Sequence, residues 1–401
     1  MPAVCFYFQL HQPRRLRRFR VFEAGHDYYD DDANARILRR VAGKCYLPTT
    51  ALLLELIKSN REQFKVAFSL TGQVIEQLQR WSPEVIDRFR ALAQTGCVEF
   101  LAETYNHSLS SCYSPGNFED EVDRHGTLIE DLFGQSPSVF RNTELVYSDA
   151  IGAQVAAMGR YRAVLAEGVD RLLDGRTPNT PYRPADKQTA RSLSLLLKNH
   201  QLSDDLAFRF GEPGWEHHPL SAATYAKWLT DQPGEVVNLF MDFETFGEHK
   251  WASTGIFDLL KQLPGEVLSR GGRFVTPGEA LDLFLPGDTY AAPEVTSWAD
   301  TERDLSAWNG NTMQSSAIKA LYELEQPILD TRDAELLADW QSLGTSDHFY
   351  YMSTKHEDDG TVHAYFNPYD SPYDAYLNYM NVLENLRQRV ERVQADGNSA
   401  V

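Results

Sequence analysis

The chain has 401 residues, of which 42% are hydrophobic and 24% are charged, and its formal net charge at pH 7 is −19. A chain of this length and composition can bury a large core, so a mainly disordered protein is excluded. The sequence contains no apolar run near the roughly 20 residues that cross a bilayer, so we expect no membrane partner. The negative charge argues against nucleic acid, whose phosphates bind basic surfaces, but it is compatible with a neutral substrate such as a sugar.

The N-terminus and the cysteines bear on the cellular compartment. The chain runs directly into an apolar segment, Val4–Leu10, without a charged leader or a small-residue cleavage site, so a cytoplasmic location is the default expectation. The four cysteines (Cys5, Cys45, Cys97 and Cys112) are widely spaced and never form a Cys-x-x-Cys pair. We therefore expect buried thiols, with neither a disulfide scaffold nor a zinc ribbon.

The first 285 residues alternate between short apolar runs and segments with helical periodicity, which is the pattern of βα units around a parallel sheet. The expected fold class is therefore α/β. Seven strands are predicted, at Val4–Leu10, Lys65–Leu70, Val98–Leu101, Ser138–Arg141, Ala163–Ala166, Ser192–Leu197 and Val236–Met241. The helices expected between them include Leu47–Ser59, Pro83–Gln94, Asn117–Phe133 and Ala222–Leu229.

Polar side chains follow nearly every predicted strand, and their positions favour a barrel over an open sheet. In a closed parallel barrel all the strand ends meet at one rim, where such folds build their active sites. An open doubly wound sheet would instead bind ligands at a switch point, usually beside a Gly-rich phosphate loop, and this sequence has no such loop. The polar residues at the strand ends are His11, Thr71, Gln73, Glu103, Glu144, Glu167, Asn199, His200, Asp242 and Glu244. The segment 274–277 is either an eighth short strand or a connection.

Beyond about residue 286 the pattern changes to helical segments joined by Pro and Gly signals. We expect a catalytic barrel over residues 1–285 and a C-terminal helical domain over residues 286–401. Two segments of the second part, 298–304 and 345–352, combine aromatic residues with carboxylates, so we expect them to dock on the barrel rim. The helices predicted here are Asn311–Glu325, Ala334–Ser342 and Asp374–Val393.

Two of the strand ends carry carboxylates that suit catalysis. Glu144 lies just past a strand, and the neighbouring Arg141 and Asn142 would keep it ionised, as a nucleophile requires; an isolated Glu is otherwise an N-cap or a rim ion pair. Asp242 and Glu244 lie among aromatic residues, including Trp251, and partial desolvation there would raise a carboxyl pKa, as a general acid requires. The competing interpretation is a structural ion-pair cluster. Aromatic faces also suit the apolar faces of sugar rings.

Other strand ends add hydrogen-bonding groups to the same rim. His11 and Gln12 follow the first strand, Gln73 follows the second, and Glu103 and His107 follow the third. Their repeated placement favours one shared site over independent structural roles. Glycoside hydrolysis needs two carboxyl groups flanking the scissile bond, and the sequence cannot give their separation. The residues alone therefore predict a carboxylate-rich barrel enzyme with aromatic subsites.

Five segments, in order along the chain, resemble the signatures of glycoside hydrolase family 57 and its α-amylase-like branch. They begin at His11, Gly72, Phe140, Met241 and Thr345 and read HQP, GQVIEQL, FRNTEL, MDFETFGEH and TSDHFYY. The resemblance implies an incomplete (β/α)7 barrel followed by a helical domain that contributes to the active site. It also implies a retaining enzyme that forms a covalent intermediate and needs neither metal nor cofactor.

The resemblance assigns roles residue by residue. It implies that Glu144 is the nucleophile and Asp242 the general acid/base. It further implies that His11, Glu103, Glu244 and Asp347 hold the sugar, and we add Trp251 as an aromatic substrate contact. The implied substrate is an α-1,4-glucan or maltooligosaccharide, with hydrolysis and glucan transfer both open.

Two other classes of function remain open at this stage. A metal-dependent polysaccharide deacetylase would use a similar barrel with a metal site, for which His11, His107, His249 and Asp242 are the available ligands. A non-catalytic glucan-binding homologue would keep the fold without turnover.

Overall fold

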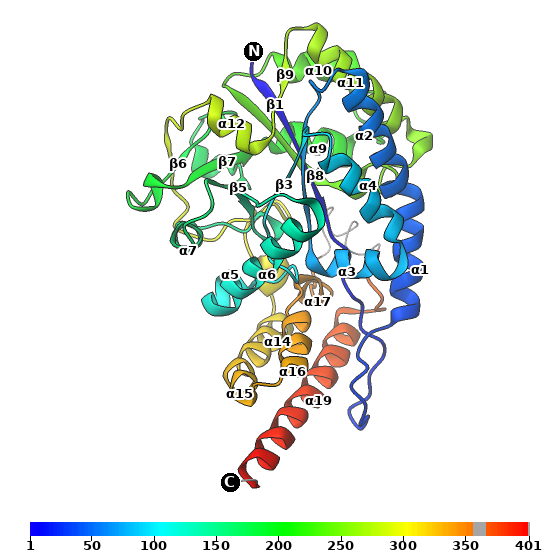
Figure 1. The fold of residues 1–401 in the computed structure, drawn as a ribbon, viewed down its shortest axis with the longest axis vertical. Helices are drawn as coiled ribbons and strands as arrows, with labels where there is room; N and C mark the ends of the chain where they lie inside the picture. Colours follow the sequence, from blue (N-terminus) through cyan, green and yellow to red (C-terminus); the bar gives the residue numbers. More distant parts are fainter. Residues whose placement is uncertain (356–365, 400–401) are drawn as a thin grey trace.

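The computed structural model describes residues 1–355 and 366–399, and Figure 1 shows the fold. Seven of its strands hydrogen-bond in two parallel groups, ordered β3-β2-β1-β8 and β4-β5-β7. These seven strands lie where the sequence predicts them, which confirms the α/β class. They are β1 (Ala3–Leu10), β2 (Val66–Leu70), β3 (Val98–Phe100), β4 (Val139–Arg141), β5 (Ala163–Glu167), β7 (Ser194–Lys198) and β8 (Val236–Asp242).

The two groups of strands are joined by isolated contacts. On one side Ala102, just after β3, forms a single parallel bridge with Phe140 of β4. On the other side the Asn199 N–H, after β7, donates to the carbonyl oxygen of Asn238 in β8, and Asn238 Nδ2 donates to the carbonyl oxygen of Leu197, both at 2.9 Å. The strands therefore form an incomplete (β/α)7 barrel, as the sequence resemblance predicts.

The segment after the last barrel strand is both a strand and a connection. β9 (Arg273–Phe274) pairs in parallel with the start of β1. Thr276 then caps α12 (Pro277–Leu283), because its hydroxyl accepts from the backbone N–H of Glu279 while the Glu279 carboxylate accepts from the backbone N–H of Thr276. Residues 274–277 therefore include both the end of a short strand and the connection to the next helix, which the sequence left as alternatives.

Alternation along β1 divides the core into an inner and an outer layer. Ala3, Cys5 and Tyr7 belong to a buried cluster that includes residues of β2, β4, β5, β7 and β8, whereas Val4 and Phe6 pack with the surrounding helices. This division is the period of two that a strand imposes on its side chains.

Helices cover the outside of the barrel, and those after residue 305 gather at one end of the molecule (Figure 1). The helices before residue 285, besides α12, include α1 (Asp31–Val41), α2 (Leu47–Ser59), α3 (Gly72–Trp81), α4 (Pro83–Ala93), α6 (Pro115–Phe133), α7 (Asp149–Ala157), α9 (His200–Asp204), α10 (Ala222–Thr230) and α11 (Ile256–Ser269). The later ones include α14 (Thr312–Tyr322), α15 (Glu325–Thr331), α16 (Ala334–Leu343), α17 (Ser346–Tyr350) and α19 (Pro372–Ser399).

The C-terminal helices pack directly on the barrel. One buried cluster contains residues of β4, β5 and β7 together with Leu321 of α14, Trp340 of α16 and Leu386 of α19. The boundary between residues 285 and 286 stays a prediction, but the shared core shows that the two parts are packed together.

An N-terminal hairpin, residues 14–30, leads away from the end of β1 and lies along α19 (Figure 1). Three asparagines of α19 bind its backbone. Asn378 Nδ2 donates to the carbonyl oxygen of Arg17, Asn381 Nδ2 to that of Phe19, and Asn385 Nδ2 to that of Glu23, at 2.9, 3.0 and 2.9 Å. The hairpin thereby links the C-terminal helix to the end of β1.

The structure also bears on the expectations about the membrane and the cysteines. Among the described residues, no helix is long and apolar enough to cross a membrane. The four cysteines are free thiols; Cys5, Cys45 and Cys97 are buried as expected, whereas Cys112 is only partly buried.

Candidate active site

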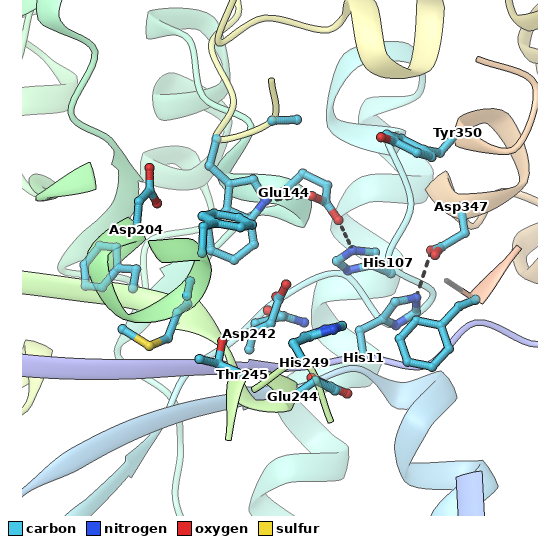
Figure 2. A pocket seen from close by; sticks show the side chains of 18 of the residues that line it. His11, His107, Glu144, Asp204, Asp242, Glu244, Thr245, His249, Asp347 and Tyr350 are labelled. Atoms are coloured by element: carbon cyan, nitrogen blue, oxygen red, sulfur yellow. Dashed lines mark hydrogen bonds and ion pairs between the residues drawn. The ribbon is translucent and has the colours of Figure 1, made fainter. Parts of the chain in front are cut away.

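The ends of the barrel strands and segments of the C-terminal part surround one cavity, shown in Figure 2. It encloses about 1150 Å³, counting the part open to solvent. Polar side chains from β1, β4, β7, β8 and α17 meet here because the carboxyl ends of parallel strands face the same rim. The residues in its wall include His11, Gln12, His107, Glu144, Lys198, Asp204, Phe208, Asp242, Glu244, His249, Trp298, Asp300, Asp347 and Tyr350.

Glu144 has an unusual backbone and a side chain held at both oxygens. Its φ is 55° and that of Leu145 is 52°, a left-handed conformation that residues other than glycine seldom adopt and that is often found at functional sites. The carbonyl oxygen of Glu144 accepts from the backbone N–H of Trp298 at 3.1 Å. Its Oε1 lies 2.7 Å from His107 Nε2, and its Oε2 accepts from Trp298 Nε1 at 2.6 Å. The carboxylate is therefore fixed in one orientation.

His107 lies between two carboxylates. Its Nε2 contacts Glu144, and its Nδ1 is 3.7 Å from Oε2 of Glu103. Burial favours the neutral ring, but the contacts with Glu103 and Glu144 outweigh it and raise the pKa of His107 to about 9. At neutral pH His107 is therefore an imidazolium that donates to Glu144.

His11 has the opposite charge state. Burial is the main cause that lowers the pKa of His11 to about 4, and the nearby His107 adds to it. The Thr71 hydroxyl lies 2.9 Å from Nδ1, and Asp347 Oδ2 lies 3.0 Å from Nε2. In the neutral ring, Thr71 donates to Nδ1 and Nε2 donates to Asp347. The His11 and His107 rings are stacked, with centroids 4.0 Å apart and 20° between their planes.

Asp242 and Glu244 reach the cavity from the end of β8, and Figure 2 shows Asp242 pointing into the space between Glu244 and Glu144. Burial, followed by the charge of Asp242, raises the pKa of Glu244 to about 8. Oε1 of Glu244 accepts from the hydroxyl of Tyr46 and from Gln12 Nε2. Near neutral pH the pair of carboxyl groups therefore retains a shared proton.

His11, His107 and Asp347 each place one donor atom within 4.8 Å of the others, which is close enough to consider a metal ion. Their geometry does not suit one. Parallel stacked imidazoles cannot both aim an in-plane lone pair at the same ion, and the facing nitrogens already contact Asp347 and Glu144. We assign no metal here. His249 and Asp242, the other ligands of the deacetylase hypothesis, also line the cavity but fall outside this group.

The structure brings together five of the seven residues that the sequence suggested for the site, namely Glu144, Asp242, His11, Glu244 and Asp347. Glu103 is fully buried behind His107 and does not line the cavity. Trp251 also lies outside the cavity wall; its side chain is 59% exposed, with Lys44 Nζ 5.7 Å from its ring centroid.

Other residues of the site were not singled out in the sequence. Lys198 Nζ lies 3.0 Å from Asp204 Oδ1 and 5.3 Å from the centroid of the Trp298 ring. Phe208 is an aromatic residue of the cavity wall and is 39% exposed. Lys198 directly follows the predicted strand Ser192–Leu197 and could have been named by the same rule as Glu144, whereas nothing in the sequence marks Phe208.

A barrel whose strand ends surround a cavity with an oriented carboxylate, a neighbouring carboxyl pair and aromatic walls belongs to the class of glycosidase-like enzymes. Comparisons with known proteins agree. The sequence model of Glycosyl hydrolase family 57 matches residues 5–293. A protein of Methanocaldococcus jannaschii described as "Putative alpha-amylase" is 39% identical over 408 residues, covering 98% of this chain and 85% of that protein.

Solved structures give the same fold at lower sequence identity. A family 57 branching enzyme of Pyrococcus horikoshii aligns with a TM-score of 0.70 at 16% identity, covering 99% of this chain and 92% of that one. The α-amylase AmyC of Thermotoga maritima aligns with a TM-score of 0.59 at 12% identity, covering 98% and 97%. The chain belongs to glycosyl hydrolase family 57, and it is an enzyme of the glycosidase and glucanotransferase kind.

Proposed function

We propose that this enzyme cleaves α-1,4-glucans with retention of configuration, with Glu144 as the nucleophile and Asp242 as the general acid/base. The observation that carries the proposal is the Glu144 carboxylate, held at both oxygens beside a cavity into which Asp242 also points. A relative described as an α-amylase and the α-glucan enzymes among the structural neighbours support the substrate class.

The mechanism has two displacements. Glu144 attacks the anomeric carbon while Asp242 gives its proton to the departing glycosidic oxygen, which leaves a covalent glycosyl-enzyme. Asp242 then takes a proton from the acceptor, which attacks the anomeric carbon and releases Glu144. Water as acceptor gives hydrolysis, and a glucan hydroxyl gives transfer. The two carboxyl groups of a retaining pair are expected about 5 to 5.5 Å apart.

The remaining predicted contacts take positions around this centre. His11, Asp347 and Glu244 line the cavity and are proposed to hydrogen-bond the sugar hydroxyls. Trp251, exposed outside the cavity wall, is proposed as a stacking surface for an outer glucose unit. Glu103 is too deeply buried to touch the sugar, so we assign it a supporting role behind His107.

The test is the variant Glu144→Gln, which keeps the size of the side chain and removes its charge. Activity on maltoheptaose should fall by roughly 10⁴-fold, as when one member of a catalytic unit is removed. The exposed Glu323→Gln on the surface serves as the matched control and should be unaffected. Sodium azide should restore turnover of an activated aryl maltooligoside by Glu144→Ala and give a glycosyl azide of inverted configuration. Wild-type activity in Glu144→Gln would refute the assignment.

The product profile of the wild-type enzyme on maltooligosaccharides separates the two reactions. Products longer than the substrate indicate transfer, and shorter products alone indicate hydrolysis. No turnover of any α-glucan would instead favour the non-catalytic homologue.

A further inference from the structure

The second inference rests on the proposed function and concerns the residues that hold Glu144. His107 occupies Oε1 and Trp298 occupies Oε2, so each oxygen of the carboxylate accepts a hydrogen bond from a different part of the chain. His107 follows β3, and Trp298 belongs to the C-terminal part. The orientation of Glu144 therefore depends on contacts between segments that are about 190 residues apart in the sequence (107 to 298).

His107 is itself fixed from several sides. Its backbone is left-handed, with φ at 54°, and its carbonyl oxygen accepts from the backbone N–H of Ser346 at 2.9 Å. Its ring lies against neutral His11 on one face. The charged groups that act on it are the carboxylates of Glu103 and Glu144 and the guanidinium of Arg141. With two carboxylates against one guanidinium, the surroundings of the ring favour a cation.

Glu103 is the one carboxylate of this group that does not reach the cavity. Its oxygens accept from Gln9 Nε2 at 3.2 and 3.4 Å, and Arg141 NH1 lies 3.7 Å from Oε2. Hydrogen bonding and charge from His107 and Arg141 outweigh burial, so the pKa of Glu103 is lowered. The charged form of Glu103 is therefore favoured, and this carboxylate lies on the far side of the His107 ring.

Trp298 supplies a neutral donor. Its ring packs near two cations, with the guanidinium carbon of Arg141 4.9 Å and Lys198 Nζ 5.3 Å from the ring centroid. Both its backbone N–H and its indole N–H donate to Glu144. This pair of bonds fixes the indole relative to the nucleophile.

We propose that Glu103, His107 and Trp298 are positioning residues for Glu144: His107 as a cation and Trp298 as a neutral donor hold the nucleophile, and Glu103 keeps the charge on His107 while Glu144 is esterified. In the first displacement an electron pair of a Glu144 oxygen forms the bond to the anomeric carbon, the glycosidic C–O bond breaks, and the departing oxygen takes the proton of Asp242. Glu144 is then a neutral ester, so Glu103 is the carboxylate that still balances His107. In the second displacement water adds to the anomeric carbon and its proton passes to Asp242. The electron pair of the ester bond returns to Glu144, whose restored negative charge lies beside the His107 cation.

The decisive variant is His107→Gln, whose amide can still donate to Glu144 but carries no charge. Without the cation the Glu144 carboxylate takes up a proton more easily, so the acid limb of kcat/KM against pH should move to higher pH by about one unit. The kcat should fall by roughly 10²-fold with little change in KM, as when one preorganised donor is lost. His26→Gln, an exposed histidine of the N-terminal hairpin, is the control and should keep the wild-type profile.

Two more variants separate charge from orientation. Trp298→Phe removes a neutral donor to Glu144 and leaves the His107 cation in place, so kcat should fall while the acid limb moves to higher pH by less than in His107→Gln. Glu103→Gln removes the far carboxylate, so His107 should lose its proton at lower pH and the alkaline limb should move downward. Circular dichroism and thermal unfolding of each variant establish whether it is folded, and Trp298→Phe and Glu103→Gln carry the test if His107→Gln is not.

The outcomes distinguish this inference from the proposed function. If Glu144→Gln is inactive and His107→Gln has the wild-type kcat and acid limb, Glu144 remains the nucleophile and the positioning roles are refuted. An acid limb that moves equally in Trp298→Phe would also refute the separation of roles. If Glu144→Gln keeps its activity, the proposed function itself fails.

Discussion

At the scale of single residues, the site separates neighbouring ionisable groups into different charge states. His107 is charged and His11 is neutral although their rings are stacked, because carboxylates flank the first and burial dominates the second. Asp242 and Glu244 lie two residues apart, and the proton that the pair retains avoids two negative charges in one desolvated pocket. These charge states are set by the neighbours of each group and not by its residue type.

The protonated state of Glu244 predicts how stability depends on pH. Its folded pKa, about 8, is raised above the unfolded value of 4.5, so its stabilisation is complete below about pH 4.5 and is lost as pH rises through 8. The isosteric Glu244→Gln does not titrate. Between pH 5 and pH 8 the free energy of unfolding of the wild type should therefore fall relative to the variant, by up to about 1.4 kcal/mol per pH unit. Urea unfolding of both proteins at several pH values measures it, and parallel curves would contradict the prediction.

At the scale of elements, the position of the segment that follows Asp242 at the end of β8 and carries Glu244 depends on one glycine. Gly247 has φ at 112°, and a Cβ there would lie 2.1 Å from the carbonyl oxygen of Lys44. Lys44 belongs to the π-helical segment η1 (Ala42–Tyr46), which also supplies the Tyr46 hydroxyl to Glu244. The close approach of these two backbones therefore positions the acidic loop.

Replacement of this glycine should disturb both stability and catalysis. Gly247→Ala forces a backbone to move and places a side chain at a disfavoured φ, at a cost of roughly 1 to 3 kcal/mol or more. The matched control is Gly43→Ala in η1, where a Cβ would meet nothing within 4 Å. Thermal unfolding and kcat on maltoheptaose should change for Gly247→Ala alone. Equal behaviour of the two variants would show that the contact with Lys44 is unimportant.

The asparagines of α19 give a second prediction at this scale. Asn378 accepts from the Phe19 N–H at 2.7 Å and donates to the carbonyl oxygen of Arg17 at 2.9 Å. Its side chain therefore binds the backbone of the hairpin as a neighbouring strand would. Asn378→Ala removes both of these bonds and the bond that Nδ2 donates to the Tyr369 hydroxyl, at a cost of roughly 1 to 3 kcal/mol. Trypsin should then cleave the hairpin faster at its arginines. Gln388→Ala, whose amide donates to Glu384 on the same helix, should leave cleavage unchanged. Faster cleavage in both variants would point to a general loosening of α19.

The strands could be predicted from the sequence because each is a short apolar run, and the rule of polar strand ends located Glu144, Asp242 and His11. The rule failed for Trp298, because the donor that matters is an indole brought in by the packing of the C-terminal part. It also placed Glu103 at the rim, since periodicity gives the position along a strand but not the depth of a side chain. The sequence predicted that segment 345–352 reaches the rim, but the role of Asp347 came from the family signature, as 336 residues separate it from its partner His11.

At the scale of the whole molecule, the barrel and the C-terminal part complete one site. Asp347 and Trp298 come from the later part and bind His11 and Glu144 of the barrel. One of these contacts involves His11, whose pKa is lowered by burial. The stability of the whole chain should therefore respond to the pH at which this group titrates.

The buried histidines predict the direction of that response on the acid side. Burial lowers the pKa of His11 and of His348 to about 4, below the unfolded value of 6.5. Because the pKa is depressed in the folded protein, the unfolded chain binds these protons first as pH falls. The stabilisation is therefore present above pH 6.5 and is lost as pH falls toward 4. The loss in the free energy of unfolding is up to about 1.4 kcal/mol per pH unit for each histidine. Over the same range Glu244 has the opposite effect, because the folded chain binds one more proton there than the unfolded chain. From these three groups together, the free energy of unfolding should therefore rise with pH by an amount that corresponds to about one proton.

His348 allows one contribution to be isolated without touching the site contacts, because its buried Nε2 has no hydrogen-bond partner among the described residues. His348→Leu keeps an apolar volume beside Tyr379 and cannot take up a proton. Between pH 6.5 and 4.5 the free energy of unfolding of the variant should fall less steeply than that of the wild type, by about 1.4 kcal/mol per pH unit. Denaturant unfolding at pH 4.5, 5.5 and 6.5 gives the two slopes. Identical slopes for the wild type and the variant would mean that His348 is protonated in the folded protein over this pH range. The packing of α17 against α19 around it would then have to accommodate a charge.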